Sequence, residues 1–209
     1  MESGHQRHFV SLRTGCQWRY LPKEYPNYNR GYYYFHKWSW DGTWERVNTV
    51  LREKVRRHAR RKVQLSLAII DSQSGRTTEV GGEHGYDGGK HVNGRKRHIL
   101  VDTMGNVLMV VAHAANSGER AGAKWLLSRV PDRLWTRLDK ILADGAYQGQ
   151  DFQTWVEDTF AVQFEISLRP TTSRRFEVAP IRWVVERPFC PSWPLAPVEQ
   201  SLPAFDRKH

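Results

Sequence analysis

The spacing of apolar residues in the first third of the chain predicts a helix. After a turn at Asp41 and Gly42, apolar side chains recur every three or four positions, as one face of an α-helix requires. These side chains are Trp44, Val47, Leu51 and Val55. We predict that Thr43 caps this helix and that the helix continues into the basic residues 55–62.

Residues 16–44 are crowded with aromatic side chains. The set comprises Trp18, Tyr20, Tyr25, Tyr28, Tyr32, Tyr33, Tyr34, Phe35, Trp38, Trp40 and Trp44. Because basic residues lie between them, stacking on unpaired bases is one use for these rings. Filling the core of a small helical domain is the commoner use, and the sequence leaves both open.

The pattern changes to strands after residue 62. An apolar, β-branched run over 63–72 predicts a buried strand that stops at Asp71. The glycine-rich segment 81–94 is too flexible and polar to be a core element. After it we expect a hairpin over 95–103 and 106–115. Helices are expected over 119–130 and 151–158, and strands over 140–145 and 162–168. The strand over 140–145 delivers a second acidic residue, Asp144, at its C-terminal end.

The last part of the chain has a different composition. Residues 169–180 are basic and irregular, and a short helical stretch over 181–189 contains Glu186. Four prolines follow, so the tail cannot be one continuous helix.

The charge distribution points to a polyanionic partner. Lys and Arg number 32 against 22 Asp and Glu, which gives a net charge of +10, and almost all of the excess lies in residues 1–62. This asymmetry predicts a nucleic-acid-binding arm attached to a body with a different task. The alternative interpretation is a solvated basic face, or a linker where the basic run 55–62 is concerned.

Length and composition exclude several classes of protein. A chain of 209 residues can bury a hydrophobic core large enough to fold without covalent cross-links. Its cysteines, Cys16 and Cys190, cannot form a disulfide framework or a four-thiolate zinc site. The longest apolar run, 108–115, is far shorter than the roughly 20 residues that a bilayer requires, and the N-terminus has no apolar signal segment. We therefore expect a cytoplasmic protein with no membrane partner.

Two aspartates that end strands are candidate catalytic residues. If the strands of Asp71 and Asp144 are adjacent and parallel, their carboxylates can face one another and form the oxygen-rich site that Mg²⁺ prefers. Glu186 is the candidate third ligand. Such a site can hold two ions that clamp the attacking and leaving oxygens of a phosphodiester. The alternative is that these carboxylates only cap the helices that follow.

Other candidate motifs fail on spacing. The run GYDGGK suggests a phosphate-binding loop, but His84 occupies the position of the required first glycine and His91 the position of the required Ser or Thr. The nine histidines include no HExxH pair, so zinc is not expected. The basic run 95–98 either contacts phosphate or places alternating residues on an exposed strand face.

Five sequence blocks together resemble the transposases of bacterial insertion sequences. The blocks are LRTGCQWRYLPKEYP (12–26), YYYFHKW with DGTWERV (32–47), the segment 69–105 that begins IIDSQSG, ADGAYQG (143–149) and RWVVERPF (182–189). They are similar to the DDE group in which a DSQS block holds the first acid and a WVVER block the last. The resemblance implies an α/β, RNase H-like fold, a mixed sheet flanked by helices and preceded by a small basic, aromatic-rich helical region.

The resemblance also implies roles for individual residues. Asp71, Asp144 and Glu186 would be the catalytic triad and hold two Mg²⁺ or Mn²⁺ ions. The implied reaction is hydrolysis at an element end, followed by attack of the freed 3′-OH on target DNA. Together with the charge pattern, the resemblance makes these residues candidates for DNA binding: Arg56, Arg57, Arg60, Arg61, Lys62, Lys90, Arg95, Lys96, Arg97 and Arg182.

The implied partner is double-stranded DNA, at the element ends and at the target, and an intact protein would act as a homo-oligomer. We expect a basic helical DNA-binding remnant over 1–62, an RNase H-like catalytic core over 63–189 and an irregular tail over 190–209.

The chain departs from the family pattern at both ends. Family members carry a further N-terminal helical region, so this chain is expected to be truncated before the block that begins near Leu12. After Phe189 the family continues as a basic helix, whereas this chain reads CPSWPLAPVEQ. Some codon choices for 190–201 would encode that helix in the next frame, so we hypothesise a frameshift that the nucleotide sequence would test. Without that helix Glu186 lacks support, and we expect impaired catalysis.

Two alternative functions remain open. One is a non-catalytic transposase fragment that binds DNA or pairs with an intact copy. The other is a metal-dependent nuclease on the same fold, which would cut DNA without joining it.

Overall fold

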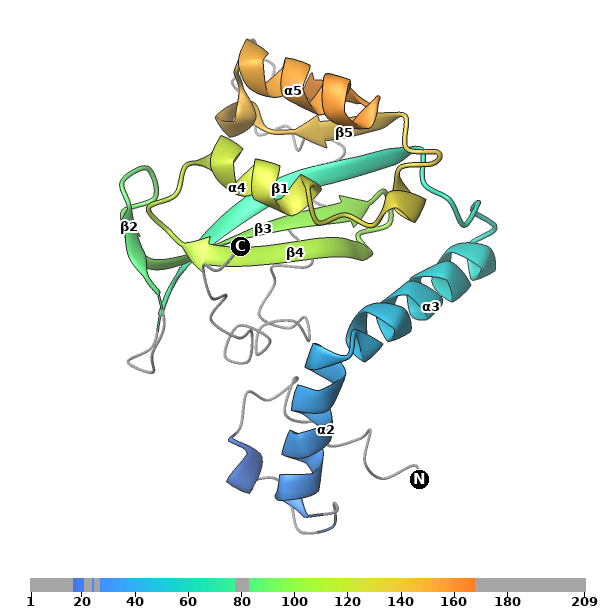
Figure 1. Cartoon of the computed structure of the whole chain (residues 1–209), viewed down its shortest axis with the longest axis vertical. Coiled ribbons are helices and arrows are strands. Elements are labelled where there is room, and N and C mark those ends of the chain that lie inside the picture. Colours follow the sequence, from blue (N-terminus) through green and yellow to red (C-terminus); the bar gives the residue numbers. More distant parts are fainter. Residues whose placement is uncertain (1–16, 21–23, 25–26, 78–82, 168–209) are drawn as a thin grey trace, which may run out of the picture. The chain divides into compact units, whose positions relative to one another are not determined.

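The computed structural model describes residues 17–20, 24, 27–77 and 83–167 (Figure 1). The described residues up to Leu51 belong to one compact unit, and those from Arg52 onward belong to a second. Each unit is described by itself. The domain boundaries predicted at residues 62 and 189 stay predictions, and the tail over 190–209 lies outside the described residues.

The first unit is a small helical assembly with an aromatic centre. It contains a 3₁₀ turn over Trp18–Tyr20, helix α2 over Tyr28–Trp40 and the beginning of helix α3, which spans Thr43–His58. Phe35 is buried, and its ring lies 5.6 Å from the ring of Trp18 and 5.8 Å from that of Trp44. Several rings therefore pack on one another, while others are exposed: Tyr20, Tyr32, Tyr33, Tyr34 and Trp40.

Helix α3 differs from its prediction at its N-terminal end. The first helical residue is Thr43, and it is the Asp41 carboxylate that accepts a hydrogen bond from the Thr43 N–H, at 3.0 Å, so Thr43 is not the cap. At its other end the helix does run into the basic residues 55–62, as predicted, and it ends within them at His58, because the backbone of Arg60 turns into the left-handed region (φ 55°).

A buried ion pair joins α3 to the sheet of the second unit. Arg56 and Asp102 are 6% and 0% exposed, and Arg56 Nη1 donates to Asp102 Oδ2 at 2.8 Å. Arg56 Nε also donates to the carbonyl of Lys62, at 2.8 Å. The other Asp102 oxygen accepts from the backbone N–H groups of Met104 and Asn106, in the turn after the strand. A single buried carboxylate therefore ties a helix to a hairpin turn.

The second unit is built on a six-stranded mixed sheet. Its strands are β1 Leu67–Arg76, β2 Gly85–Asp87, β3 Val92–Asp102, β4 Val107–Ala114, β5 Lys140–Ala143 and β6 Gln163–Ile166. The order is β2-β3-β1-β5-β6, with β4 also paired to β3. Strands β1, β5 and β6 are parallel, and β3 runs antiparallel to β1, β2 and β4.

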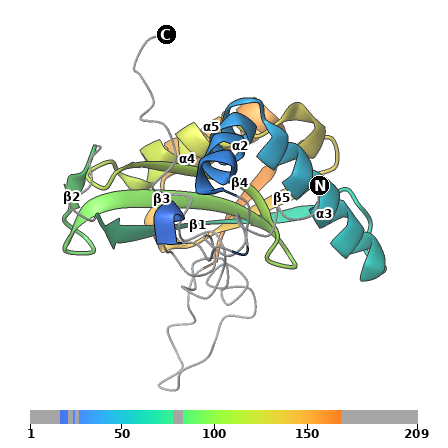
Figure 2. The ribbon, with the colours of Figure 1, turned by 90° about the horizontal axis from the view of Figure 1, so that it is seen from below.

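Two helices cover one face of this sheet (Figures 1 and 2). They are α4 over Glu119–Leu127 and α5 over Gln150–Phe160, and short 3₁₀ turns span Asp132–Leu134 and Gly145–Tyr147. The core lies beneath them, where Leu126 and Val156 pack with Ile70, Leu100 and other strand residues. The predicted mixed sheet flanked by helices is confirmed.

One local prediction within the sheet was wrong. Strand β1 does not stop at Asp71 but continues to Arg76, because residues 71–76 pair with residues 94–99 of β3. The described residues 83–94 of the glycine-rich segment include β2 and the beginning of β3, which pair with each other, although none of them belongs to the hydrophobic core. The polar pattern concealed both features, because pairing through the main chain does not require apolar side chains.

Candidate active site

Asp71 and Asp144 occupy equivalent positions on neighbouring strands. The parallel pair β1 and β5 is in register at Ile69 and Leu142, and each aspartate comes two residues later in its own strand. Asp144 follows the last residue of β5 with an extended backbone (φ −83°, ψ 176°). The parallel arrangement on which the sequence prediction depended is therefore present.

The two aspartates share the sheet face opposite α4 and α5. Successive side chains of a strand point to opposite faces. Ala68 and Ile70 of β1, and Ile141 and Ala143 of β5, belong to the core beneath the helices. Asp71 and Asp144 are each one residue out of phase with these side chains, so both project from the other face.

Each aspartate also makes a local backbone contact. Asp71 Oδ1 accepts a hydrogen bond from the N–H of Ser72 at 2.7 Å, and Asp144 Oδ1 accepts one from the N–H of Ala146 at 3.0 Å. Asp144 thereby caps the 3₁₀ turn over Gly145–Tyr147. The capping role that the sequence left open for Asp144 is thus real, and it orients the carboxylate without excluding metal binding.

The third predicted ligand, Glu186, lies outside the described residues, as does Arg182. Within residues 17–20, 24, 27–77 and 83–167, no three His, Cys, Asp or Glu side chains gather closely enough to hold a metal ion. The described part therefore contributes two carboxylates to the candidate site.

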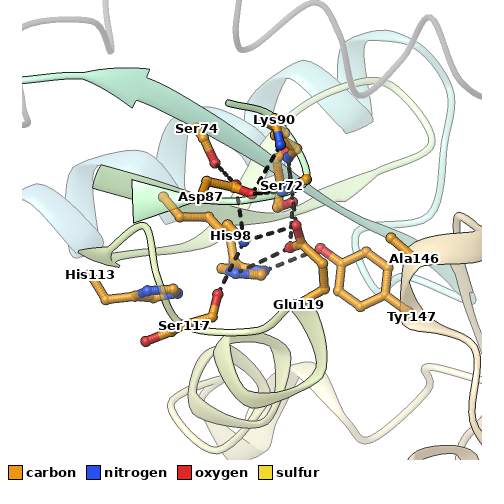
Figure 3. A network of polar contacts seen from close by, with 12 residues as sticks. Ser72, Ser74, Asp87, Lys90, His98, His113, Ser117, Glu119, Ala146 and Tyr147 are labelled. Atoms are coloured by element: carbon orange, nitrogen blue, oxygen red, sulfur yellow. Dashed lines mark hydrogen bonds and ion pairs between the residues drawn. The ribbon is translucent and has the colours of Figure 1, made fainter. Parts of the chain in front are cut away.

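A polar cluster that the sequence interpretation missed lies on the α4 side of the sheet (Figure 3). Its centre is Glu119, the first residue of α4. Glu119 Oε2 accepts a hydrogen bond from the Ser72 hydroxyl at 2.6 Å, and Oε1 lies 3.0 Å from Lys96 Nζ and 3.7 Å from Lys90 Nζ. Although burial alone would raise the pKa of Glu119, the hydrogen bonds from Ser72 and Lys96 hold it below its usual value.

Lys96 joins this cluster to a second buried carboxylate. Its side chain is 4% exposed, and Nζ lies 3.2 Å from Asp87 Oδ2 and donates to the carbonyl of Ser117 at 3.0 Å. Asp87 also accepts from the Ser74 hydroxyl and from backbone N–H groups of the following turn. Burial opposes ionisation of Asp87, but these hydrogen bonds and Lys96 lower its pKa well below the usual range.

His98 and Tyr147 extend the cluster toward Asp144. The His98 ring is fully buried, its Nδ1 lies 3.1 Å from the Tyr147 hydroxyl, and its Nε2 faces Glu119 at 3.7 Å. Burial lowers the pKa of His98 to about 3, so the ring is neutral. Because Nε2 faces a carboxylate, we assign the proton to Nε2, and Nδ1 then accepts the hydrogen bond from Tyr147.

The Tyr147 hydroxyl lies within the field of both aspartates. Burial raises its pKa well above the ordinary value, and the negative charges of Glu119, Asp71 and Asp144 raise it further. The hydroxyl is therefore a permanent hydrogen-bond donor.

Comparison with known families assigns the chain. The model of the family described as "Transposase DDE domain" matches residues 62–190, more than half of the chain, and that of "Putative transposase of IS4/5 family" matches residues 7–48. The chain belongs to the DDE transposases. No curated protein matches it. The family identifies the mixed sheet as RNase H-like, and it makes this transposase, at the level of the family, a phosphoryl-transfer enzyme that acts on DNA and uses divalent metal ions.

The basic residues predicted to bind DNA fall into two groups in the transposase. Arg57, Arg60, Arg61 and Lys62 are exposed at the end of α3 and in the turn after it. Arg95 and Arg97 alternate with Lys96 on β3 and pair with Gly75 and Gln73 of β1, so they lie on the same sheet face as Asp71. Lys90 is partly exposed and donates to the backbone carbonyl of Ser72 at 3.0 Å.

Arg56 and Lys96 are the exceptions, because both are buried in ion pairs. Arg56 is held by Asp102, and Lys96 by Asp87 and Glu119. Their charges stabilise the fold, so we do not carry these two residues into the DNA-binding proposal. Burial alternates over residues 95–98, as expected for a strand with one exposed face: Lys96 and His98 are 3% and 0% exposed, whereas Arg95 and Arg97 are partly exposed.

No helix in the described part of the transposase is long and apolar enough to cross a membrane. Residues such as Glu119, Asp87 and Tyr147 were not identified from the sequence, because their partners come from distant segments. The one available signal was the polar composition of residues 72–74, directly after a buried strand.

Proposed function

We propose that this transposase cleaves double-stranded DNA at element ends and joins the freed strand to target DNA, with Asp71 and Asp144 as metal ligands and Glu186 as the third. The observation that carries the proposal is the equivalent placement of Asp71 and Asp144 on adjacent parallel strands, on one face. In this proposal the protein acts in the cytoplasm as a homo-oligomer.

The donor set fits Mg²⁺ or Mn²⁺. Hard divalent cations prefer carboxylate oxygens, and two half-buried aspartates on one face of the sheet supply them. When bound, two such ions lower the pKa of an attacking water and stabilise a leaving 3′ oxygen. Asp144 is oriented for this role by its bond to the Ala146 N–H, and Asp71 by its bond to the Ser72 N–H.

The proposed reaction has two phosphoryl transfers. First, water attacks the phosphodiester at the element end, the bond from phosphorus to the 3′ oxygen breaks, and the strand ends in a 3′-OH. That hydroxyl then attacks a target phosphodiester and displaces another 3′ oxygen, so no covalent enzyme intermediate is needed.

The transposase's basic side chains hold the substrate. Arg95 and Arg97 share the face of Asp71 and are placed to contact phosphates near the site of cleavage. Lys90 stands one residue from Asp71, through its bond to Ser72. The exposed group Arg57, Arg60, Arg61 and Lys62 supplies contacts along the duplex. Arg182 is proposed as a further contact beside Glu186.

The test is cleavage and strand transfer by the purified chain with Mn²⁺ and a labelled duplex from the element end. We expect weak cleavage and weak joining, in line with the impaired catalysis predicted above, and both should fall by at least about 100-fold in Asp71→Asn and Asp144→Asn, because each change removes a charge from the metal site. Asp151→Asn, a change in the exposed first turn of α5, is the control and should leave both products unchanged.

The same experiment distinguishes the alternative functions. Cleavage without joined products would indicate a nuclease on this fold. DNA binding that is equal in the wild type and in both aspartate variants, with no products at all, would indicate a non-catalytic fragment. Either result contradicts the proposal.

A further inference from the structure

The residues next to the two aspartates point into the polar cluster on the other side of the sheet. Ser72 follows Asp71, and its hydroxyl donates to Glu119. Tyr147 ends the 3₁₀ turn that Asp144 begins, and its hydroxyl bonds to His98. A short backbone segment therefore connects each candidate metal ligand to a residue that makes a buried hydrogen bond.

The first of these hydrogen bonds ends at Glu119, and the second ends at His98, whose ring faces Glu119. Its carboxylate binds Ser72 directly, and it faces His98 Nε2 at 3.7 Å, while His98 Nδ1 binds Tyr147. Ser72 and His98 are also register partners on β1 and β3. Figure 3 shows Glu119 between Ser72, His98 and Tyr147. A change at Glu119 would thus affect both chain segments that carry the aspartates.

The charges of the cluster are balanced and paired. Asp87 and Glu119 are opposed by Lys96 and Lys90, and Lys96 contacts both carboxylates. A buried polar network in which every charge is paired specifies one arrangement of its chain segments. The cluster joins β1, the β2–β3 turn, β3, α4 and the turn after β5, which are far apart in the sequence.

We propose that Glu119 and Tyr147 are positioning residues, which set the separation of Asp71 and Asp144 from the opposite face of the sheet. The inference rests on the proposed function of the two aspartates. Metal ligands must be held within about half an ångström of their productive positions, and supporting hydrogen bonds commonly change metal affinity by about 10–100-fold.

The first test uses Tyr147→Phe, which removes one hydroxyl and keeps the ring. Mn²⁺ binding to the full chain, measured by the loss of the free-Mn²⁺ paramagnetic resonance signal, should weaken by about 10-fold or more. The control is Tyr86→Phe, because Tyr86 makes the same kind of bond, to His91 Nδ1 at 3.1 Å, on an exposed part of β2. The control should bind Mn²⁺ like the wild type.

The second variant, Glu119→Gln, keeps the shape of the side chain and removes its charge. It should weaken Mn²⁺ binding by a similar factor, whereas Glu165→Gln, which breaks an exposed pair with Lys140, should not. Thermal unfolding of all four variants checks that they are folded. Comparing each variant with its control shows whether weaker Mn²⁺ binding comes from lost positioning or follows from the removal of any tyrosine hydroxyl or any carboxylate charge.

The outcomes also separate this inference from the proposed function. If Asp71→Asn abolishes Mn²⁺ binding while folded Tyr147→Phe and Glu119→Gln bind within about two-fold of the wild type, the positioning role is overturned and the proposed function stands. If the wild type and Asp71→Asn bind Mn²⁺ equally, the proposed metal site fails, and the positioning role fails with it.

Discussion

At Gly122, helix α4 passes directly over two imidazoles, of which His98 is buried and His113 is half-buried. A Cβ atom placed there would lie closer to Nε2 of His98 and of His113 than Cβ atoms pack in real proteins. The two rings are stacked with their centroids 5.0 Å apart. Glycine is therefore needed at this position for close approach and not for an unusual backbone angle, and that distinction leads to a prediction.

Replacing Gly122 with alanine should destabilise the second unit by about 1–3 kcal/mol, because the imidazoles beneath it cannot move without breaking the bond to Tyr147. Gly88→Ala is the control, since a Cβ there meets nothing within 4 Å. Urea unfolding of the three proteins measures the difference. Equal stability of the two variants would show that the space above the rings is not restrictive.

These two histidines should make stability depend on pH. Burial lowers the pKa of His98 to about 3 and also lowers that of His113. Below about pH 6.5 the unfolded chain therefore binds protons that the folded protein does not, so stability is present above that pH and is lost as the pH falls. From pH 7.5 to pH 5.5 the free energy of unfolding should decrease by about 1.4 kcal/mol through His98, and the lowered pKa of His113 should add to this loss.

Urea unfolding at the two pH values measures this loss, and in His113→Leu it should be smaller by the share of one imidazole. Nuclear magnetic resonance provides a direct check, because the ring signals of His98 should stay in their neutral positions down to pH 5.5. Titration of His98 near pH 6.5 in the folded protein would contradict the assignment.

Among the elements, α3 shows how position decides the value of an ion pair. Arg56 pairs with Asp102 in the interior, whereas the next residue, Arg57, pairs with Glu53 at the surface, where the side chains are 61% and 31% exposed. The helix also leaves Leu51 and Val55 exposed while it buries Arg52 and Arg56. Within the second unit, the residues that α3 buries are thus arginines.

Removing the charge of Asp102 in Asp102→Asn should cost about 3–5 kcal/mol of stability, because Arg56 is left as an unpaired buried cation. Glu53→Gln, on the same helix, should change stability by no more than about 0.5 kcal/mol, since the pair is exposed. Denaturant unfolding compares the two variants. A small effect of Asp102→Asn would mean that water reaches the pair.

Across the whole molecule, basic side chains serve two separate purposes. Some basic side chains neutralise buried carboxylates, as Arg56 and Lys96 do, and others stay at the surface. Only the second kind can release counterions from DNA. The number of surface contacts, and not the total charge of the chain, should therefore set the dependence of DNA binding on salt.

The double change Arg60→Gln and Arg61→Gln should weaken binding to any duplex sequence and reduce the slope of log affinity against log salt by about 2, one unit for each lost phosphate contact. Lys124→Gln serves as the control, since Lys124 is exposed on α4 and lies over the Trp155 ring. Titrations at several salt concentrations measure the slope. An unchanged slope in the double variant would place the duplex elsewhere.

Local patterns in the sequence were sufficient to predict the elements named next and to single out the two aspartates. Strand β5, helices α4 and α5 and the β3–β4 hairpin follow from runs of apolar residues and from the turn at Gly105, because short-range periodicity is set by neighbouring residues. The same runs place Asp144 directly after a strand. Family blocks then indicated the RNase H-like fold, which the family comparison supports.

Contacts between distant segments determined the features that these local patterns do not predict. Ser72 and Glu119 are 47 residues apart, His98 and Tyr147 are 49 apart, and Arg56 and Asp102 are 46 apart. Whether a lysine is buried or a strand continues past an aspartate depends on partners from such segments, since a polar group is stable in the interior only when another segment satisfies it. Local sequence thus determines the elements and the acidic residues that follow them, whereas long-range hydrogen bonds determine which polar residues are buried.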